Sequence, residues 1–147
     1  MIKEAIARIE MEQQRAETIR SFIKSLRGCR NPVHVTEIYS PPRVTVVAGQ
    51  MGLKPGEAMD LRTGWDFTLA RHRDAARKYI EKVQPKLIIC SPECTMFSTL
   101  QNLSRKTWNE EREEKLREAK EHVKFVMEIC REQHAAGRCF LFEHPAN

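Results

Sequence analysis

Two side chains capable of covalent or proton-transfer chemistry follow short apolar runs of this sequence. Cys94 comes four residues after the run 86–90, and Glu143 comes directly after the run 139–142. A cysteine reacts as its thiolate, and a carboxylate beside an apolar run is costly unless it is hydrogen-bonded. Each residue also has an interpretation without a functional role. Cys94 could be a small buried hydrophobic residue, and Glu143 could be a solvated strand end. We expect Cys90, inside its run, to be a core thiol.

Cysteines and histidines also recur near these runs, at positions 90, 94, 130, 134, 139 and 144. In a strand that ends near residue 90, Cys90 would point into the core and Cys94 would lie past the end. The two would then not share a metal ion. The sequence also has no cysteine pair with the two-residue spacing of a zinc knuckle. We therefore expect no metal centre.

The pattern of apolar and turn residues predicts the elements that position these side chains. Short apolar or β-branched runs predict strands at 33–39, 57–61, 86–90 and 139–142. Periodic segments predict helices at 44–51, from a capping Thr68 to Pro85, and at 108–136 after a capping-box pattern at Thr107. Strands that alternate with helices are typical of an α/β fold with a parallel sheet.

In open parallel sheets, ligands bind outside the carboxyl ends of the strands. The residues after the predicted strands are Tyr39, Ser40 and Pro41, then Asp60 with Asp66 and Phe67, then Pro92 and Cys94, and finally Glu143. We therefore expect one edge of the sheet to gather a thiol, several carboxylates and aromatic rings.

The segment before the sheet has a different pattern. Residues 1–27 place apolar side chains at heptad positions, with Glu12 as the one polar residue among them. This pattern predicts a helix that either forms a coiled-coil homodimer or caps the domain. Pro32 breaks the chain, so we divide it into a helical segment, 1–30, and an α/β domain, 31–147.

Composition restricts the class of protein. The chain has 147 residues, 41% of them hydrophobic and 31% charged, and contains no apolar run long enough for a membrane span. Five scattered cysteines, an odd number, indicate reduced thiols and an intracellular protein, cytoplasmic or nuclear. The net charge of +5 favours a polyanionic partner. Six basic and six acidic residues between positions 105 and 121 indicate a solvated helix face.

The order of elements and the residues after the strands resemble the cytosine-5 DNA methyltransferase branch of the S-adenosylmethionine-dependent methyltransferases. The chain looks most like the divergent methyltransferase-like domain of retroelement polyproteins and related mobile-element proteins. The resemblance covers about residues 34–147 and implies a Rossmann-like parallel sheet flanked by helices.

Four segments carry this resemblance. Residues 37–40 (Glu-Ile-Tyr-Ser) are similar to the family's first-strand motif Asp-Leu-Phe-Ser-Gly, and residues 64–67 (Gly-Trp-Asp-Phe) to its Gly-Asp-Ile element near the adenine. Residues 91–98 (Ser-Pro-Glu-Cys-Thr-Met-Phe-Ser) are similar to the nucleophile loop Pro-Pro-Cys-Gln-x-Phe-Ser. Residues 142–145 (Phe-Glu-His-Pro) stand where the family has Glu-Asn-Val.

The resemblance implies roles for individual residues. Cys94 would add to carbon 6 of a flipped-out cytosine, and Glu143 would hydrogen-bond and protonate the ring at nitrogen 3. The acidic residue after the second strand, Asp60, would hold the cofactor ribose. The other implied contacts to S-adenosylmethionine are Tyr39, Ser40, Pro41, Asp66, Phe67 and Pro92. The implied partner is a nucleic acid, DNA in the family, with RNA left open.

Three departures from the family lower the expected activity. Ser40-Pro41-Pro42-Arg43 replaces a glycine turn, so the loop is stiffer and has fewer backbone donors. Glu93 replaces a proline beside the proposed nucleophile, and its charge would raise the pKa of a nearby thiol. The family's later strands and target-recognition region have no counterpart. We therefore expect a truncated gene product or a cofactor-half fragment, weak or inactive in isolation.

Two other functions agree with the same residues. The first is an assembly module, in which the heptad helix 1–27 oligomerises and the methyltransferase-like domain is a scaffold. The second is a different thiol-dependent enzyme, in which Cys94 works with a histidine such as His144.

Overall fold

The computed structural model describes residues 3–11, 13–14, 17, 33–97 and 110–144, and divides the chain into the units 1–30 and 31–147. In the first unit the described residues are helical and exposed. A continuous helix over 1–27 stays a prediction, because residues 18–32 lie outside the described part. In the described part of the chain, no helix has the length and apolar character of a membrane span.

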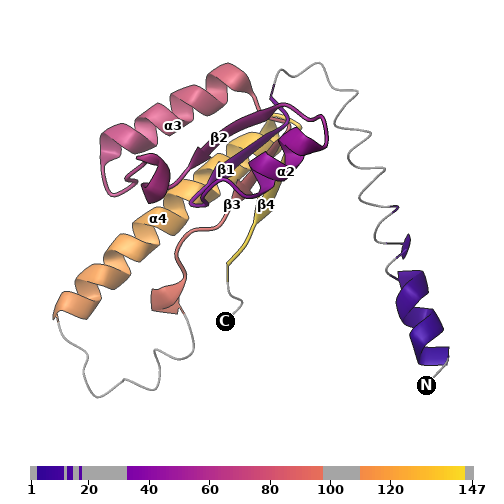
Figure 1. Cartoon of the computed structure of the whole chain (residues 1–147). Helices are drawn as coiled ribbons and strands as arrows, with labels where there is room; N and C mark the ends of the chain where they lie inside the picture. The colour runs from indigo at the N-terminus through magenta and orange to yellow at the C-terminus, as the bar shows by residue number, and fades with distance from the viewer. Residues whose placement is uncertain (1–2, 12, 15–16, 18–32, 98–109, 145–147) are drawn as a thin grey trace. The chain divides into compact units, whose positions relative to one another are not determined.

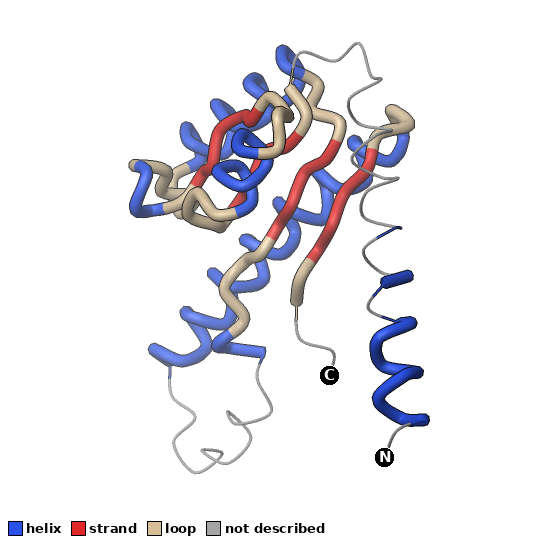
Figure 2. Tube along the Cα trace, turned by 45° about the vertical axis from the view of Figure 1, so that its right-hand side comes forward, coloured by secondary structure: helices blue, strands red, loops and turns tan. Residues whose placement is uncertain are grey.

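The second unit contains a four-stranded sheet whose paired strands are all parallel, as predicted. The strands β1 (Val35–Ile38), β2 (Pro55–Met59), β3 (Leu87–Cys90) and β4 (Cys139–Phe142) lie in the order β2-β1-β3-β4. Figure 2 shows the strands side by side. Between β1 and β3 the direction of winding reverses, which opens a crevice at the carboxyl ends of parallel strands.

The second strand begins and ends two residues earlier than predicted. It ends at Met59 because Asp60 starts a 3-10 turn, η1 (Leu61–Thr63). The carboxylate of Asp60 accepts a hydrogen bond from the Arg62 N–H (3.0 Å), and the Asp60 N–H donates to the Thr63 hydroxyl (3.0 Å). This reciprocal cap takes the backbone of Asp60 out of the strand.

The helices α2 (Val44–Gln50), α3 (Ala70–Val83) and α4 (Glu110–Ala135) flank the sheet. Arg77 on α3 forms ion pairs with two glutamates of α4, so these helices lie side by side. Ile38 of β1 belongs to the core that α3 and α4 cover, whereas its neighbour Glu37 binds the start of α2. Because successive strand residues point to opposite faces, α2 covers the other face.

The start of α3 corrects one prediction. Its first residue is Ala70 and its N-cap is Leu69, without a side-chain cap. Thr68 does not cap the helix, because its hydroxyl donates instead to the carboxylate of Asp66 (2.6 Å). The predicted capping box at Thr107 lies outside the described residues. The first half of α4 extends beyond the carboxyl ends of the strands, and it therefore reaches the site described next (Figure 1).

Candidate functional site

A cavity of about 360 Å³ opens beyond the carboxyl ends of the strands. Its size lies in the range of about 300–1,000 Å³ that is usual for small-molecule sites. Four residues predicted from the sequence line it: Tyr39, Asp60, Asp66 and Phe67. The other lining residues are Leu61, Trp65, Thr68, Ser91, Glu93, Glu118 and His122. We call this cavity the cleft.

Tyr39 leaves β1 in a left-handed backbone conformation, with φ of 59°. A bulky residue adopts this conformation at a cost, and such strain concentrates at functional sites. The turn is held by the Tyr39 N–H, which donates to the Met59 carbonyl (2.8 Å). It directs the tyrosine ring against Phe67, with ring centroids 4.8 Å apart. Tyr39 therefore forms a fixed aromatic wall of the cleft.

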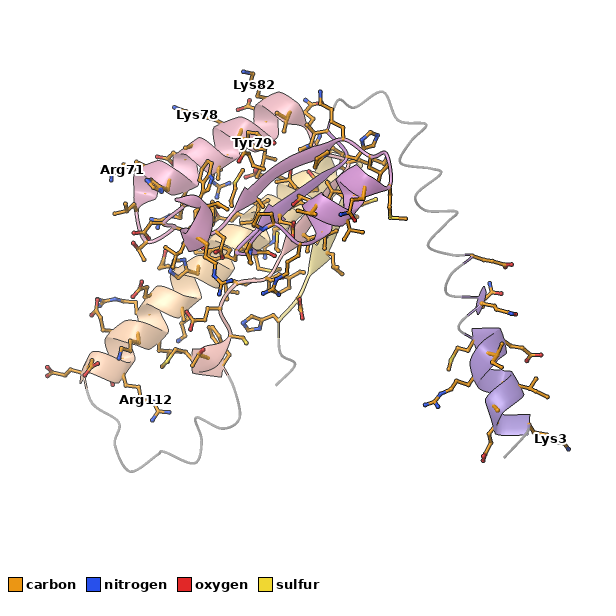
Figure 3. All side chains as sticks on the ribbon, viewed as in Figure 1. Lys3, Arg71, Lys78, Tyr79, Lys82 and Arg112 are labelled. Atoms are coloured by element: carbon orange, nitrogen blue, oxygen red, sulfur yellow. The ribbon has the colours of Figure 1, made fainter. Side chains whose placement is uncertain are left out.

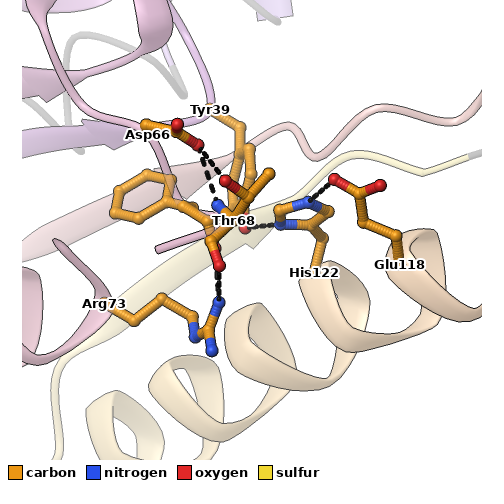
Figure 4. A network of polar contacts seen from close by, with 7 residues as sticks. Tyr39, Asp66, Thr68, Arg73, Glu118 and His122 are labelled. Atoms are coloured by element: carbon orange, nitrogen blue, oxygen red, sulfur yellow. Dashed lines mark hydrogen bonds and ion pairs between the residues drawn. The ribbon is translucent and has the colours of Figure 1, made fainter. Parts of the chain in front are cut away.

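The hydroxyl of Tyr39 lies 2.6 Å from Nδ1 of His122 on α4 (Figure 4). Burial raises the pKa of the phenol, which keeps its proton at neutral pH. In the neutral imidazole Nδ1 is then the acceptor and Nε2 carries the proton. Nε2 faces the carboxylate of Glu118 at 3.7 Å. The three side chains form a phenol–imidazole–carboxylate series along the cleft wall.

His122 and Glu118 were not predicted as site residues. Their four-residue spacing on a densely charged helix is typical of a solvated face. Their place in the cleft becomes evident only when α4 is packed against the edge of the sheet. Only 19% of the His122 side chain is exposed, and 53% of that of Glu118.

The loop between β2 and α3 forms another side of the cleft. Asp66 accepts hydrogen bonds from the hydroxyl (2.6 Å) and the N–H (3.0 Å) of Thr68, and these bonds lower the pKa of Asp66. Arg73 donates to the carbonyls of Phe67 (2.6 Å) and Thr68 (3.1 Å), which ties the loop to α3. Figure 4 shows these contacts beside the Tyr39–His122 pair. The loop is therefore braced by its own polar side chains and by Arg73 of α3.

The predicted residues Ser40 and Pro41 do not line the cleft. The Ser40 hydroxyl donates to the carboxylate of Glu37 (2.9 Å), which is only 1% exposed. Glu37 also accepts from the N–H (2.8 Å) and hydroxyl (2.7 Å) of Thr45 and from the N–H of Arg43 (3.1 Å). Burial alone would raise the pKa of Glu37, but these hydrogen bonds hold it below the ordinary value. A buried carboxylate therefore organises the loop between β1 and α2.

The remaining predicted residues lie after β3 and β4. Pro92 is buried, whereas Cys94 and Glu143 are exposed. The Glu143 N–H donates to the Cys90 carbonyl (2.9 Å), and its carboxylate accepts from the Ser91 hydroxyl (3.4 Å). The structure thus places Glu143 next to a cleft residue. No hydrogen bond joins Cys94 to Glu143 in the part of the chain that the structure describes.

A second cavity, of about 310 Å³, lies beside the turn that contains Cys94. It shares three lining residues with the cleft: Glu93, Glu118 and His122. Its other lining residues are Thr95, Met96, Lys115 and Ala119. The shared residues make the two cavities neighbours along α4.

Cys90 is fully buried at the end of β3, as predicted for a core thiol. Within the described ranges, no three histidine, cysteine or acidic side chains come together in a geometry that could hold a metal ion. Comparison of the chain with protein-family models, curated proteins and solved structures found no match.

Proposed function

We propose that the chain binds S-adenosylmethionine in the cleft and is a Rossmann-like protein of the cytosine-5 DNA methyltransferase type. The observation that supports this most is the composition of the cleft wall. An acidic residue, Asp60, follows β2, and the aromatic rings of Tyr39 and Phe67 line the same cavity. Carboxylates suit ribose hydroxyls, and aromatic faces suit an adenine ring.

The adenosine half of the cofactor fits these residues better than the amino-acid half. In nucleotide-binding folds, N–H groups at the start of the first helix face the anionic part of the ligand. Here the N–H groups of Arg43 and Thr45 donate to Glu37 instead. Residues 40–43 therefore offer few donors to a carboxylate, and we expect modest affinity.

Cys94 and Glu143 are the proposed catalytic residues. The Cys94 sulfur would bond to carbon 6 of an extruded cytosine, while Glu143 would protonate nitrogen 3. The bound cofactor would supply the methyl group to carbon 5. The carbon 5 proton would then pass to water, the proton on nitrogen 3 would return to Glu143, and the sulfur would depart as thiolate. Flipping is required because these atoms are inaccessible in stacked DNA.

The nucleic-acid partner is supported by the surface of α3. This helix has five basic and two acidic residues. Figure 3 shows Arg71, Lys78 and Lys82 along its outer side, and all three are exposed. Such a face attracts phosphate backbones without reading sequence.

Calorimetric titration of the full chain with S-adenosylmethionine tests cofactor binding. Asp60→Asn keeps the oxygen that accepts the Arg62 N–H but removes the charge. It should weaken binding about tenfold, the effect of one charged hydrogen bond. Asp74→Asn, an exposed carboxylate of α3, is the matched control and should bind like the wild type. No binding heat up to about 1 mM cofactor, the limit of weak affinity, would refute the proposal.

Methyl transfer is tested separately, with a cytosine-containing DNA duplex and labelled cofactor. Cys94→Ser should abolish incorporation and leave cofactor affinity within about twofold, because a serine hydroxyl is a far weaker nucleophile. Cys139→Ser, a free thiol of β4, is the control. Equal incorporation by both variants would exclude Cys94 as the nucleophile.

A second candidate function is oligomeric assembly through the heptad segment. Its supporting observation is that Ile9, at a heptad core position, is 54% exposed in the first unit. Light scattering should show a dimer for the wild type and a monomer for Ile9→Asp. A monomeric wild type at all concentrations would remove this candidate.

A further inference from the structure

The wall of the cleft is acidic, although the chain as a whole has a net charge of +5. Its lining includes four carboxylates, those of Asp60, Asp66, Glu93 and Glu118, and no lysine or arginine. Arg73, on α3, lines a neighbouring cavity and donates to backbone carbonyls of the loop. The local field therefore favours a cation.

The aromatic rings of the cleft wall also favour a cation. Tyr39 packs on Phe67 with centroids 4.8 Å apart, and Trp65 lies 6.0 Å from Phe67. Ring faces attract sulfonium and ammonium groups through their quadrupoles, and more strongly when water is excluded. The cavity and these rings provide the space and the apolar surface for a ligand. The carboxylates determine which ligand charge is favoured.

The loop after β1 has few hydrogen-bond donors available to an anionic ligand. A phosphate normally binds backbone N–H groups at the start of a helix. Here Glu37 accepts the N–H groups of Arg43 and Thr45 and the hydroxyl of Ser40. The protein's own buried carboxylate occupies the donors that a ligand phosphate or carboxylate would use.

Each of the four carboxylates has a polar partner within the chain. Asp60 caps η1, and Asp66 accepts two hydrogen bonds from Thr68. Glu93 accepts the Thr95 hydroxyl (2.9 Å), and Glu118 faces Nε2 of His122 at 3.7 Å. The last two differ from the others in their position. Glu93 and Glu118 line both cavities, so they lie where the cleft meets the pocket beside the Cys94 turn. A methyl donor must present its sulfonium toward this junction if the acceptor lies near Cys94.

We propose that Glu93 and Glu118 make the cleft selective for positively charged adenosine derivatives. The sulfonium cofactor then binds more tightly than its uncharged thioether product, S-adenosylhomocysteine, and adenine nucleotides are rejected. This inference rests on the proposed function. Its consequence is that methyl transfer removes the charge that holds the ligand, so the product leaves readily.

Calorimetry on the full chain at low salt tests the selectivity, with S-adenosylmethionine, S-adenosylhomocysteine and adenosine monophosphate as ligands. The sulfonium should bind about three- to tenfold more tightly than the thioether, as two partly exposed ion pairs allow, and the nucleotide should bind weakest. High salt should reduce this ratio.

The double variant Glu93→Gln/Glu118→Gln should lower the affinity for the sulfonium to that for the thioether and leave the thioether within about twofold. Glu57→Gln/Glu81→Gln, which removes two exposed carboxylates outside the cleft, is the control and should keep the ratio. Equal binding of sulfonium and thioether by the wild type overturns the selectivity but leaves the proposed function intact. Binding of neither ligand overturns both.

Discussion

Glu37 offers a quantitative test of how the loop after β1 is built. One of its oxygens accepts the Ser40 hydroxyl, and the other accepts both donors of Thr45 and the Arg43 N–H. Glu37→Leu keeps a side chain of similar size but leaves the two donors of Thr45 and the Arg43 N–H without this acceptor, whereas the Ser40 hydroxyl can still donate to the Pro41 carbonyl (3.0 Å). Each unsatisfied buried donor costs about 1–3 kcal/mol, and part of this cost is recovered when the loop admits water. We expect a loss of about 3–5 kcal/mol.

The variant Glu37→Gln removes the charge of the side chain but keeps its shape, so it measures the contribution of the charge alone. Its amide oxygen can replace the carboxylate oxygen that accepts three hydrogen bonds, but these become neutral bonds of roughly half the strength. Relief of the buried charge offsets part of the difference. We therefore expect a loss of about 1–3 kcal/mol, between the wild type and Glu37→Leu.

Urea unfolding at neutral pH measures these free energies. Glu57→Gln, an exposed carboxylate on β2, is the control and should change stability by no more than about 0.5 kcal/mol. If Glu37→Leu matched this control, Glu37 would not be the anchor of the loop.

The same carboxylate predicts a pH dependence. The pKa of Glu37 lies lower in the folded chain than in the unfolded one. Its contribution to stability is therefore complete above the ordinary glutamate pKa, and it is lost as the pH falls through the lowered value. The difference in unfolding free energy between wild type and Glu37→Gln should shrink on acidification, and a difference that grew would contradict the assigned hydrogen bonds.

Three further predictions concern other parts of the second unit. A Cβ atom at Gly56 would lie less than 3.0 Å from three packed side-chain atoms, so Gly56→Ala should cost about 1–3 kcal/mol in urea unfolding. Gly49→Ala, in α2 with only ordinary contacts, should gain up to about 1 kcal/mol, and equal effects would refute the packing argument. Iodoacetamide should alkylate exposed Cys94 in the native protein and buried Cys90 only after unfolding, which peptide mass spectrometry would detect. Labelling of both cysteines in the native protein would contradict the burial of Cys90. Nitrogen NMR should find the proton of neutral His122 on Nε2, and a mixture of both tautomers would exclude the phenol as a donor.

The order of strands and helices was predictable because the runs that form them are local. Lys86–Cys90 is short, apolar and preceded by a proline, and β3 occupies Leu87–Cys90. The second strand begins two residues before the predicted start, although Pro55 and Gly56 are residues that normally disfavour strands. Pairing with β1 overrides that preference, since Val35 aligns with Pro55 in the register of the sheet.

The candidate site was predictable in part. The rule that ligands bind at strand ends selected Tyr39, Asp60, Asp66 and Phe67, which line one cavity. The same rule selected Ser40, whose hydroxyl turns inward to a buried glutamate. A strand-end rule names the residues near an edge, but it does not determine the direction in which each side chain points.

By itself, the sequence determined the alternation of strands and helices, because hydrophobic periodicity and turn residues act over a few positions. It also determined that carboxylates and aromatic residues would follow the strands. Only the tertiary structure decided that His122, in the middle of a charged helix, would contact Tyr39 at the cleft wall, with Glu118 beside it. Residues about eighty positions apart meet through packing of α4 beyond the sheet edge, and local sequence preferences do not encode that meeting.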